Sequence, residues 1–305
     1  MSIKNRAYIA GAFEHPTRHA PDKSLVQLHA ECAIGALADA GLSKNDIDAF
    51  YYAGDASGIS AMSLVDYLNL KVRHVDGTET GGTSYLLHVS HAAQAIAAGK
   101  CNAALITLAG RPRSEGHSGA APRATEAQVP ESQWESPFSA TTVNLYALCA
   151  QRHMYEFGTT PEQLAWVKVA ASHHAQHNPN AMLKNVVTVE EVLASPMQFD
   201  PLTRYQCCPP TCGAAAAIVC SDAFARKHGI SNPVFIAAQA LTTDTPGSFD
   251  EKSMMKLVGY DMSKTAAQKV YEQSGMGPEN IDVVELHDCF SANELLTYEA
   301  LGLCP

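Results

Sequence analysis

A short motif that occurs twice places the strongest limit on how this chain can fold. Ala40-Gly-Leu-Ser-Lys-Asn-Asp-Ile-Asp48 is matched, with substitutions, by Ser274-Gly-Met-Gly-Pro-Glu-Asn-Ile-Asp282. Each copy follows an alanine-rich helical pattern and precedes a strand pattern, and each helix follows a further strand pattern, at 7–13 and at 234–240. Two similar β-α-β units in one chain indicate a duplicated fold.

The rest of the chain alternates between strand and helix patterns. Apolar runs predict a turn and strand at 46–53 and buried strands at 103–110 and 213–220. Helical patterns occur at 24–40, 60–69, 84–98, 142–157, 160–177 and 189–194. This alternation predicts an α/β fold with a mainly parallel sheet and helices on its faces.

The middle of the chain differs in composition from the two flanking regions. Residues 111–140 are rich in Pro, Ser, Gly, Glu and Arg and have little periodicity, and helical patterns follow them. We therefore expect a mostly helical insertion at about 111–205. The expected division is an N-terminal half at 1–225, which includes this insertion, and the start of a C-terminal half at 226–305.

Composition argues against several classes of protein. The chain has 305 residues, of which 46% are hydrophobic and 17% charged, with a formal net charge of −10. Without a basic run, binding to nucleic acid or to an anionic membrane surface is not expected. No signal peptide and no apolar run long enough to span a membrane is recognised. Most of the nine cysteines lie in apolar runs, so we expect buried, reduced thiols and a cytoplasmic location.

The stretch 282–294 has the pattern of a ligand-binding junction. Its apolar residues predict a buried strand at 283–286, and Ser291 with Glu294 predicts a capping box at the start of the next helix. His287 would then lie between the carboxyl end of a strand and the amino end of a helix, where open α/β sheets bind ligands. An imidazole there can bond a substrate oxygen or transfer a proton, although a bond to a backbone carbonyl explains the spacing equally well.

The same region resembles a known family. The segment 285–305, Glu-Leu-His-Asp-Cys-Phe-Ser-Ala-Asn-Glu-Leu-Leu-Thr-Tyr-Glu-Ala-Leu-Gly-Leu-Cys-Pro, resembles the His-Asp-x-Phe segment of sterol-carrier-protein type thiolases. Further segments that resemble this family lie at 143–155, 206–209, 213–218 and 251–264. The resemblance implies a duplicated, layered α-β-α thiolase-like fold, a dimer, and an active site that contains His287. It also implies that the second half is incomplete here, because the family continues with a Gly-His-Pro motif and a late catalytic Cys or His.

One position departs from the family pattern. A thiolase has its nucleophilic Cys at the start of the buried helix that corresponds to 84–98, where the helix N-terminus favours the thiolate. The matching stretch, 77–85, contains no Cys. Gly82 lies closest to the expected position, with Glu79 as the alternative if the alignment shifts. The chain therefore lacks the thiol that would form an acyl-enzyme.

The residues around Gly82 still offer groups for catalysis. The amides of Gly82, Thr83 and Ser84 can bind an oxyanion at a helix N-terminus. The hydroxyl groups of Thr83 and Ser84 are possible nucleophiles without a visible base, and ordinary helix capping is the simpler explanation. Tyr85 is a candidate acid/base residue, for which packing against the core is the simpler explanation.

Other cysteine and histidine clusters have simple explanations. Cys207, Cys208 and Cys212 lack a fourth ligand at the spacing of a zinc finger, so packing is favoured and no metal is expected. Cys289 is next to His287, but the family has its nucleophile elsewhere. The histidines at 173–177 are expected on a solvated helix face.

The resemblance implies an enzyme that acts on an acyl-CoA thioester. Without the Cys, the favoured reaction is retro-aldol cleavage of a C–C bond, which needs a base and enolate donors but no thiol. Family members of steroid side-chain degradation that lack the nucleophile are thought to be such aldolases, with a small OB-fold partner. This implies a steroid or fatty side chain as substrate, CoA as part of that substrate, no further cofactor, and a homodimer. Two alternatives remain: an acetyl-CoA acyltransferase (3-ketoacyl-CoA thiolase) and a non-catalytic subunit of a thiolase-like complex.

Overall fold

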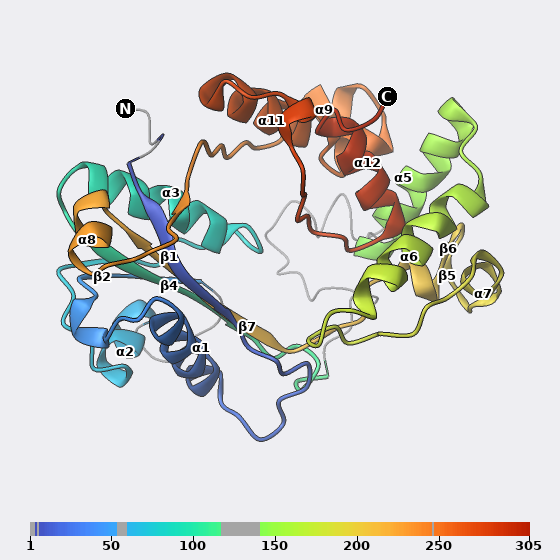
Figure 1. Cartoon of the computed structure of the whole chain (residues 1–305). Helices are drawn as coiled ribbons and strands as arrows, with labels where there is room; N and C mark the ends of the chain where they lie inside the picture. Colours follow the sequence, from blue (N-terminus) through green and yellow to red (C-terminus); the bar gives the residue numbers. More distant parts are fainter. Residues whose placement is uncertain (1–3, 5, 54–59, 117–140, 246) are drawn as a thin grey trace, which may run out of the picture. The chain divides into compact units, whose positions relative to one another are not determined.

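The computed structural model describes residue 4 and residues 6–53, 60–116, 141–245 and 247–305 (Figure 1). Contacts divide the chain into two compact units. The first consists of Met1–Gly116 and Thr211–Gln239, and the second of His117–Pro210 and Ala240–Pro305. Much of the expected polar segment at 111–140 lies outside the described residues. The expected division into two duplicated halves, 1–225 and 226–305, remains a prediction.

The first unit is built on a six-stranded sheet with the order β3-β2-β4-β7-β1-β8. Strand β2 is parallel to β3 and β4, whereas β7 is antiparallel to β4 and β1, and β8 is antiparallel to β1. The strands are β1 Tyr8–Glu14, β2 Ala49–Ala53, β3 His74–Asp76, β4 Ala103–Gly110, β7 Gly213–Cys220 and β8 Val234–Phe235.

The expectation of a mainly parallel sheet is therefore wrong. Strand β4 is buried along most of its length, so its pattern is the continuous apolar run that is typical of parallel strands. Its partner β7 nevertheless runs in the opposite direction. Burial on both faces produces the same residue pattern in either orientation, and strand direction therefore could not be derived from it.

Helices cover both faces of this sheet, with α1 and α2 on one face and α3 on the other (Figure 1). Alternate residues of β2 point to the two faces. Phe50 packs in the core beside Leu28 of α1, whereas Tyr51 packs in the opposite core with Ala93 of α3. The unit is thus a layered α-β-α structure, as expected. The helices of this unit are α1 Leu25–Asp39, α2 Ser60–Tyr67, α3 Ser84–Ala97 and α8 Asp222–Lys227.

The sequence repeat has a matching local structure in its two copies. Gly41 follows α1 and Gly275 ends α11 (Tyr260–Ser274), and both have a left-handed backbone, with φ of +65° and +74°. A 3₁₀ turn follows each glycine, at Lys44–Asp46 and at Pro278–Asn280. The strands that precede the two copies, β1 and β8, pair with each other in one sheet, although β8 covers only Val234–Phe235 of the expected 234–240.

The second unit is mainly helical. Its core joins Val143 and Ala147 of α5, Leu164 of α6 and Ala292 of α12 around Phe290. Its helices are α5 Thr142–Phe157, α6 Pro161–Ala175, α7 Val189–Ala194, α9 Gly247–Asp250, α10 Met254–Leu257, α11 and α12 Ser291–Ala300, and its strands are β5 Met197–Phe199 and β6 Leu202–Thr203. None of the helices in the described parts of either unit is long and apolar enough to cross a bilayer.

The expected strand at 283–286 does not form. The described backbone is irregular from 281 to 288, and Val283 is 78% exposed. A strand needs a neighbour for its backbone hydrogen bonds. No strand in the described part of the chain pairs with this segment. An apolar run alone is therefore not sufficient for strand structure here.

The expected capping box of Ser291 and Glu294 is also wrong. The N-cap of α12 is Phe290, which has an extended backbone with φ of −150° and makes no side-chain capping bond. Phe290 is buried in the core of the second unit, and this packing places Ser291 inside the first turn. Glu294 accepts a hydrogen bond from the hydroxyl of Tyr298 instead.

Candidate active site

The loop before α3 is stabilised by hydrogen bonds among its own residues. Ser84 Oγ lies 3.0 Å from Glu79 Oε1 and 2.7 Å from the Gly81 carbonyl, and it accepts a bond from the Thr80 amide at 2.7 Å. The Ser84 amide donates to the Gly81 carbonyl at 3.0 Å. Glu79 is therefore a base beside this hydroxyl that the sequence did not reveal, but Ser84 is fully buried. Its contacts favour a role in building the turn.

Gly82, the residue closest to the position expected for a thiolase cysteine, leaves open space for a side chain. A Cβ atom at this position would meet no atom within 4 Å, and the glycine is exposed. The neighbouring Gly81 has a left-handed backbone with φ of +73°, whereas Gly82 does not. Thr83, the N-cap of α3, makes no side-chain capping bond, so the expected capping role of its hydroxyl is not observed. Because the Ser84 amide is engaged, Gly82 and Thr83 are the better candidates for oxyanion donors.

Tyr85 is half-buried in the first turn of α3. Its side chain packs against the core between α3 and the sheet, together with Val89. This position agrees with the core-lining explanation. An acid/base role for Tyr85 remains a prediction.

His287 lies in the second unit, two residues before the core residue Cys289. The residue is exposed, and its carbonyl accepts a bond from the Asn293 side chain at 2.6 Å. This bond holds the backbone at His287 against the first turn of α12. The imidazole ring of His287 takes no part in it. The ring is therefore accessible to a ligand, which agrees with a functional role and does not establish one.

Asp288, beside His287, belongs to a cluster of acidic groups that sequence reasoning missed. Burial raises the pKa of the Asp288 carboxyl group, and a hydrogen bond and the charge of Glu294 raise it further, whereas the charge of Lys168 opposes this shift. Within the described structure, Asp288 Oδ1 is buried and has no hydrogen-bond partner. A carboxyl group that keeps its proton near neutral pH can donate that proton. The sequence does show two acidic residues, Asp288 and Glu294, around the start of α12. The capping-box prediction used only Glu294, and the possible interaction of the two carboxyl groups was missed.

The cysteines offer little nucleophilic character. All nine are free, and loss of solvation raises the pKa of every thiol except that of Cys212, including those of the exposed residues Cys208 and Cys304. Burial also opposes ionisation of Cys212, but hydrogen bonds from Ser114 and nearby backbone groups outweigh it and lower the pKa. Cys212 is fully buried. Cys289, next to His287, has a pKa raised to about 12 by burial, so it is a thiol at neutral pH.

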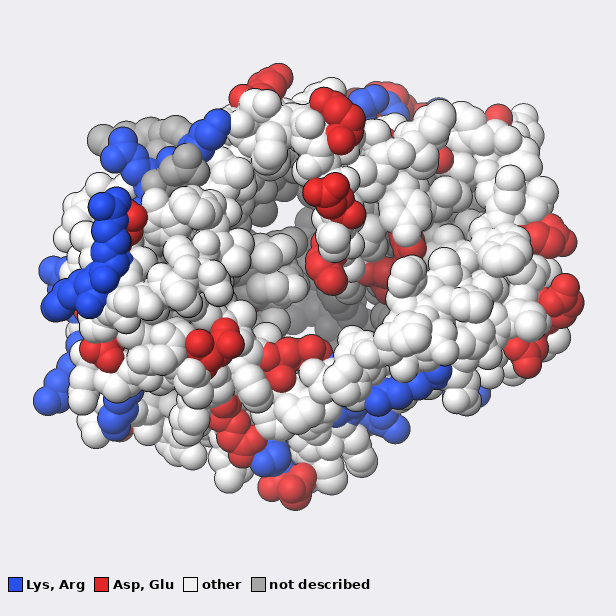
Figure 2. Space-filling view, viewed as in Figure 1, with Lys and Arg blue, Asp and Glu red and all other residues white. Residues whose placement is uncertain are grey.

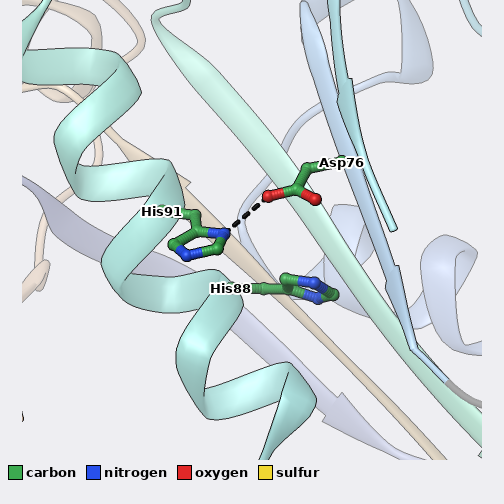
Figure 3. A group of neighbouring side chains, drawn as sticks. All are labelled: Asp76, His88 and His91. Atoms are coloured by element: carbon green, nitrogen blue, oxygen red, sulfur yellow. Dashed lines mark hydrogen bonds and ion pairs between the residues drawn. The ribbon is translucent and has the colours of Figure 1, made fainter. Parts of the chain in front are cut away.

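A second group of residues in the first unit has the composition of a metal site. Asp76 at the end of β3 and His88 and His91 of α3 point toward one another, and each has a possible ligand atom within 4.8 Å of the others (Figure 3). Sequence reasoning missed this group because it considered only the cysteines as metal ligands. No other such group of three occurs in the described residues.

The second unit contains a pocket that none of the predicted site residues lines. Its volume is about 570 Å³, and it is lined by His153, Phe157, Thr159, Gln163, Tyr260, Leu295, Glu299 and Pro305. His153 bonds Thr159 at 2.7 Å and Glu299 at 2.8 Å, which links α5 to α12. Residues 287–289 do not line this pocket.

Uncharged side chains cover most of the face shown in Figure 2, with acidic and basic side chains between them. This distribution agrees with a charged fraction of only 17% and an excess of acidic residues.

Comparison with known proteins identifies the relatives of this chain. Residues 248–305 match the family described as Thiolase C-terminal domain-like. Sterol carrier protein 2 of Rattus norvegicus is 51% identical over 162 residues, which are 53% of this chain and 30% of the relative. The match thus spans about a third of the length of that curated relative. The acetyl-CoA acetyltransferase of Methanothermobacter thermautotrophicus is 33% identical over 288 residues, which are 92% of this chain and 73% of the relative.

The fold has close counterparts among solved structures. The Ltp2-ChsH2(DUF35) aldolase is 26% identical, with a TM-score of 0.84, and the match covers 99% of this chain and 78% of that one. Human mitochondrial 3-ketoacyl-CoA thiolase in complex with CoA is 14% identical, with a TM-score of 0.74, and the match covers 100% of this chain and 84% of that one. The second likeness concerns the fold alone.

Proposed function

The chain belongs to the thiolase superfamily, in its sterol-carrier-protein type, and on that premise we propose that it cleaves a C–C bond of a β-hydroxyacyl-CoA by a retro-aldol reaction. The observation that supports this proposal most directly is Gly82, which provides open space but no thiol at the start of α3. Eight of the nine cysteines have a raised pKa and the ninth is fully buried, so none of them is a good substitute.

The proposed reaction needs no co-reactant. A base removes the proton of the β-hydroxyl group, the Cα–Cβ bond breaks, and its electron pair forms the enolate of the shorter acyl-CoA. The hydroxyl carbon becomes the carbonyl group of the second product, and the enolate carbon takes up a proton. We propose the amides of Gly82 and Thr83 as donors to the enolate oxygen, and Tyr85 is our candidate for the proton transfer. We propose His287 as a further catalytic residue, whose imidazole can bond a substrate oxygen or transfer a proton.

A partner protein is part of the proposal. The solved aldolase is named for two components, Ltp2 and ChsH2(DUF35). Its likeness to this chain supports an assembly with a small OB-fold protein, in addition to a homodimer. CoA enters as part of the substrate, and a steroid or fatty side chain is the proposed acyl group.

The experiment uses a β-hydroxyacyl-CoA with a steroid or fatty side chain and no added free CoA. The full chain, alone and with an OB-fold partner, should form a shorter acyl-CoA and a carbonyl compound in equal amounts, measured by liquid chromatography and mass spectrometry. Products that appear only from a β-ketoacyl-CoA with added CoA would show thiolysis and contradict the proposal.

The acyltransferase remains the second candidate, because the archaeal relative with that name matches 92% of this chain. It requires a thioester on one of the cysteines. Intact mass after incubation with an acyl-CoA separates the two reactions, since a retro-aldol enzyme forms no acyl adduct. If neither reaction occurs with the partner present, the non-catalytic subunit is favoured.

A further inference from the structure

We propose that Asp76, His88 and His91 form a binding site for a divalent transition-metal ion, for which Zn²⁺ is the ion to test. Asp76 is the last residue of β3, and the two histidines lie one turn apart on α3, where residues i and i+3 share a face. Figure 3 shows the three side chains converging from these two elements.

His88 is the buried residue of this group. Its side chain is fully buried, and in the described structure neither ring nitrogen has a hydrogen-bond partner. Leaving a buried polar atom unpaired is unfavourable, so such a group in a folded protein usually has a function or a missing partner. Burial lowers the pKa of His88 although the charge of Asp76 opposes this shift. The ring is therefore the neutral imidazole that a metal ion binds.

Asp76 and His91 provide two further ligands. His91 Nδ1 lies 2.5 Å from Asp76 Oδ2, so the pair shares a proton that an ion can replace. The other carboxylate oxygen accepts bonds from the amide and the hydroxyl of Thr78, at 3.1 and 2.7 Å. These bonds orient the carboxylate, as contacts of metal ligands commonly do. Zinc ligands lie about 3.3 Å apart at metal–ligand distances of about 2.0–2.2 Å, so this pair must open by about 1 Å.

The donor set selects the class of ion. Two imidazole nitrogens and one carboxylate suit Zn²⁺ and its neighbours, whereas Mg²⁺ and Ca²⁺ prefer oxygen ligands alone. The side chains of His91 and Asp76 are 31% and 27% exposed, which provides a path for entry. Three protein ligands also leave a coordination position for water.

A simple ion pair is the alternative explanation for these residues. It accounts for His91 and Asp76, which are half-buried and bonded to each other, but not for His88. A bound ion satisfies all three side chains. It also joins the end of β3 to α3 and so closes the loop 77–83, which contains Gly82. We therefore expect the ion to restrict the motion of this loop.

The test is zinc titration of the full chain after treatment with a chelator, with competition against a chromophoric chelator. One Zn²⁺ per chain should bind, and Asp76→Asn and His91→Gln should each weaken binding by at least about tenfold because one of three ligands is lost. Bound Co²⁺ should have the absorption spectrum of a site with nitrogen ligands. Amide hydrogen exchange in the loop 77–83 should slow when Zn²⁺ is added.

Two control variants use other histidines of the chain. His15→Gln removes a similar pair, in which His15 lies 2.6 Å from Glu31, and should leave zinc binding unchanged. The double variant His173→Gln and His177→Gln removes exposed histidines of the second unit, which are the obvious surface site. Zinc binding that disappears in this double variant but persists in Asp76→Asn and His91→Gln would overturn the proposal. Circular dichroism of each variant checks the fold, and His88→Asn is the third variant if one of the two is misfolded.

Discussion

Asp288 and Glu294 place two carboxyl groups within hydrogen-bonding reach of each other around the start of α12, with the charge of Lys168 acting on Asp288. Two half-buried carboxyl groups that are close to each other cannot both ionise without a large cost. The pair therefore holds a proton at a pH where an exposed aspartate has lost it.

We first predict that this pair makes the stability of the chain depend on pH. Burial and Glu294 raise the pKa of Asp288 to about 8. A raised pKa means that the folded state binds the proton more tightly, so the stabilisation is complete below the unfolded pKa of about 4 and is lost as the pH rises to about 8. Between these two pKa values the free energy of unfolding should fall by about 1.4 kcal/mol per pH unit, and Asp288→Asn should lack this slope.

Urea denaturation followed by circular dichroism at several pH values measures this difference. Asp282→Asn, at an exposed position of the same segment, should keep the wild-type pH dependence. Parallel curves for the wild type and Asp288→Asn would show that the Asp288 carboxyl group does not hold a proton in this range.

The second prediction restores the nucleophile. A Cβ at Gly82 meets no atom within 4 Å and needs no left-handed backbone, so Gly82→Cys should fold with a change in stability below about 0.5 kcal/mol. Its thiol at the helix N-terminus should be acylated by an acyl-CoA, whereas the wild type should show no stable acyl adduct by intact mass.

The matched control for this variant is Gly81→Cys. Gly81 has φ of +73°, so a side chain there should cost about 1–2 kcal/mol and place the thiol one residue away. A stable acyl adduct on the wild-type chain would restore the acyltransferase hypothesis, and equal acylation of both variants would show that position 82 has no special reactivity.

The third prediction concerns His287. His287→Ala should lower turnover by about 10²–10³. Stability should be unchanged, because His287 is exposed. A crystal structure with a bound CoA thioester measures the distance from the thioester oxygen to the His287 imidazole. His177→Ala, at an exposed position of the second unit, should remain fully active. Full activity of His287→Ala would identify a structural histidine.

The fourth prediction tests the link between α5 and α12. Glu299 lies 2.8 Å from the buried His153, and Glu299→Ala leaves a buried nitrogen of that ring without its partner. The free energy of unfolding should decrease by about 1–3 kcal/mol. The control is Glu156→Ala, which removes a pair with Arg152 on the surface of α5 and should cost less than about 1 kcal/mol. Equal losses in urea denaturation would contradict the importance of the buried link.

Most of the helices could be predicted from the residues alone, because their ends are set by neighbours in the chain. Thr160 and Gln163 form the capping box that starts α6, with Pro161 in its first turn, and Gly158 ends α5 in the left-handed region. These signals act over a few residues and do not require knowledge of what packs around them. The family resemblance and the absence of a cysteine at Gly82 were equally visible, since both depend only on residue identity.

Properties that depend on distant neighbours required the folded structure. Strand direction in β7 and the exposure of Val283 follow from which strands are available for pairing, and an apolar run does not encode this. Asp76 meets His91 across fifteen positions of sequence because β3 and α3 pack together. The raised pKa of Asp288 likewise arises from burial beside Glu294. Electrostatic and metal-binding properties require short distances between groups, and only packing creates those distances.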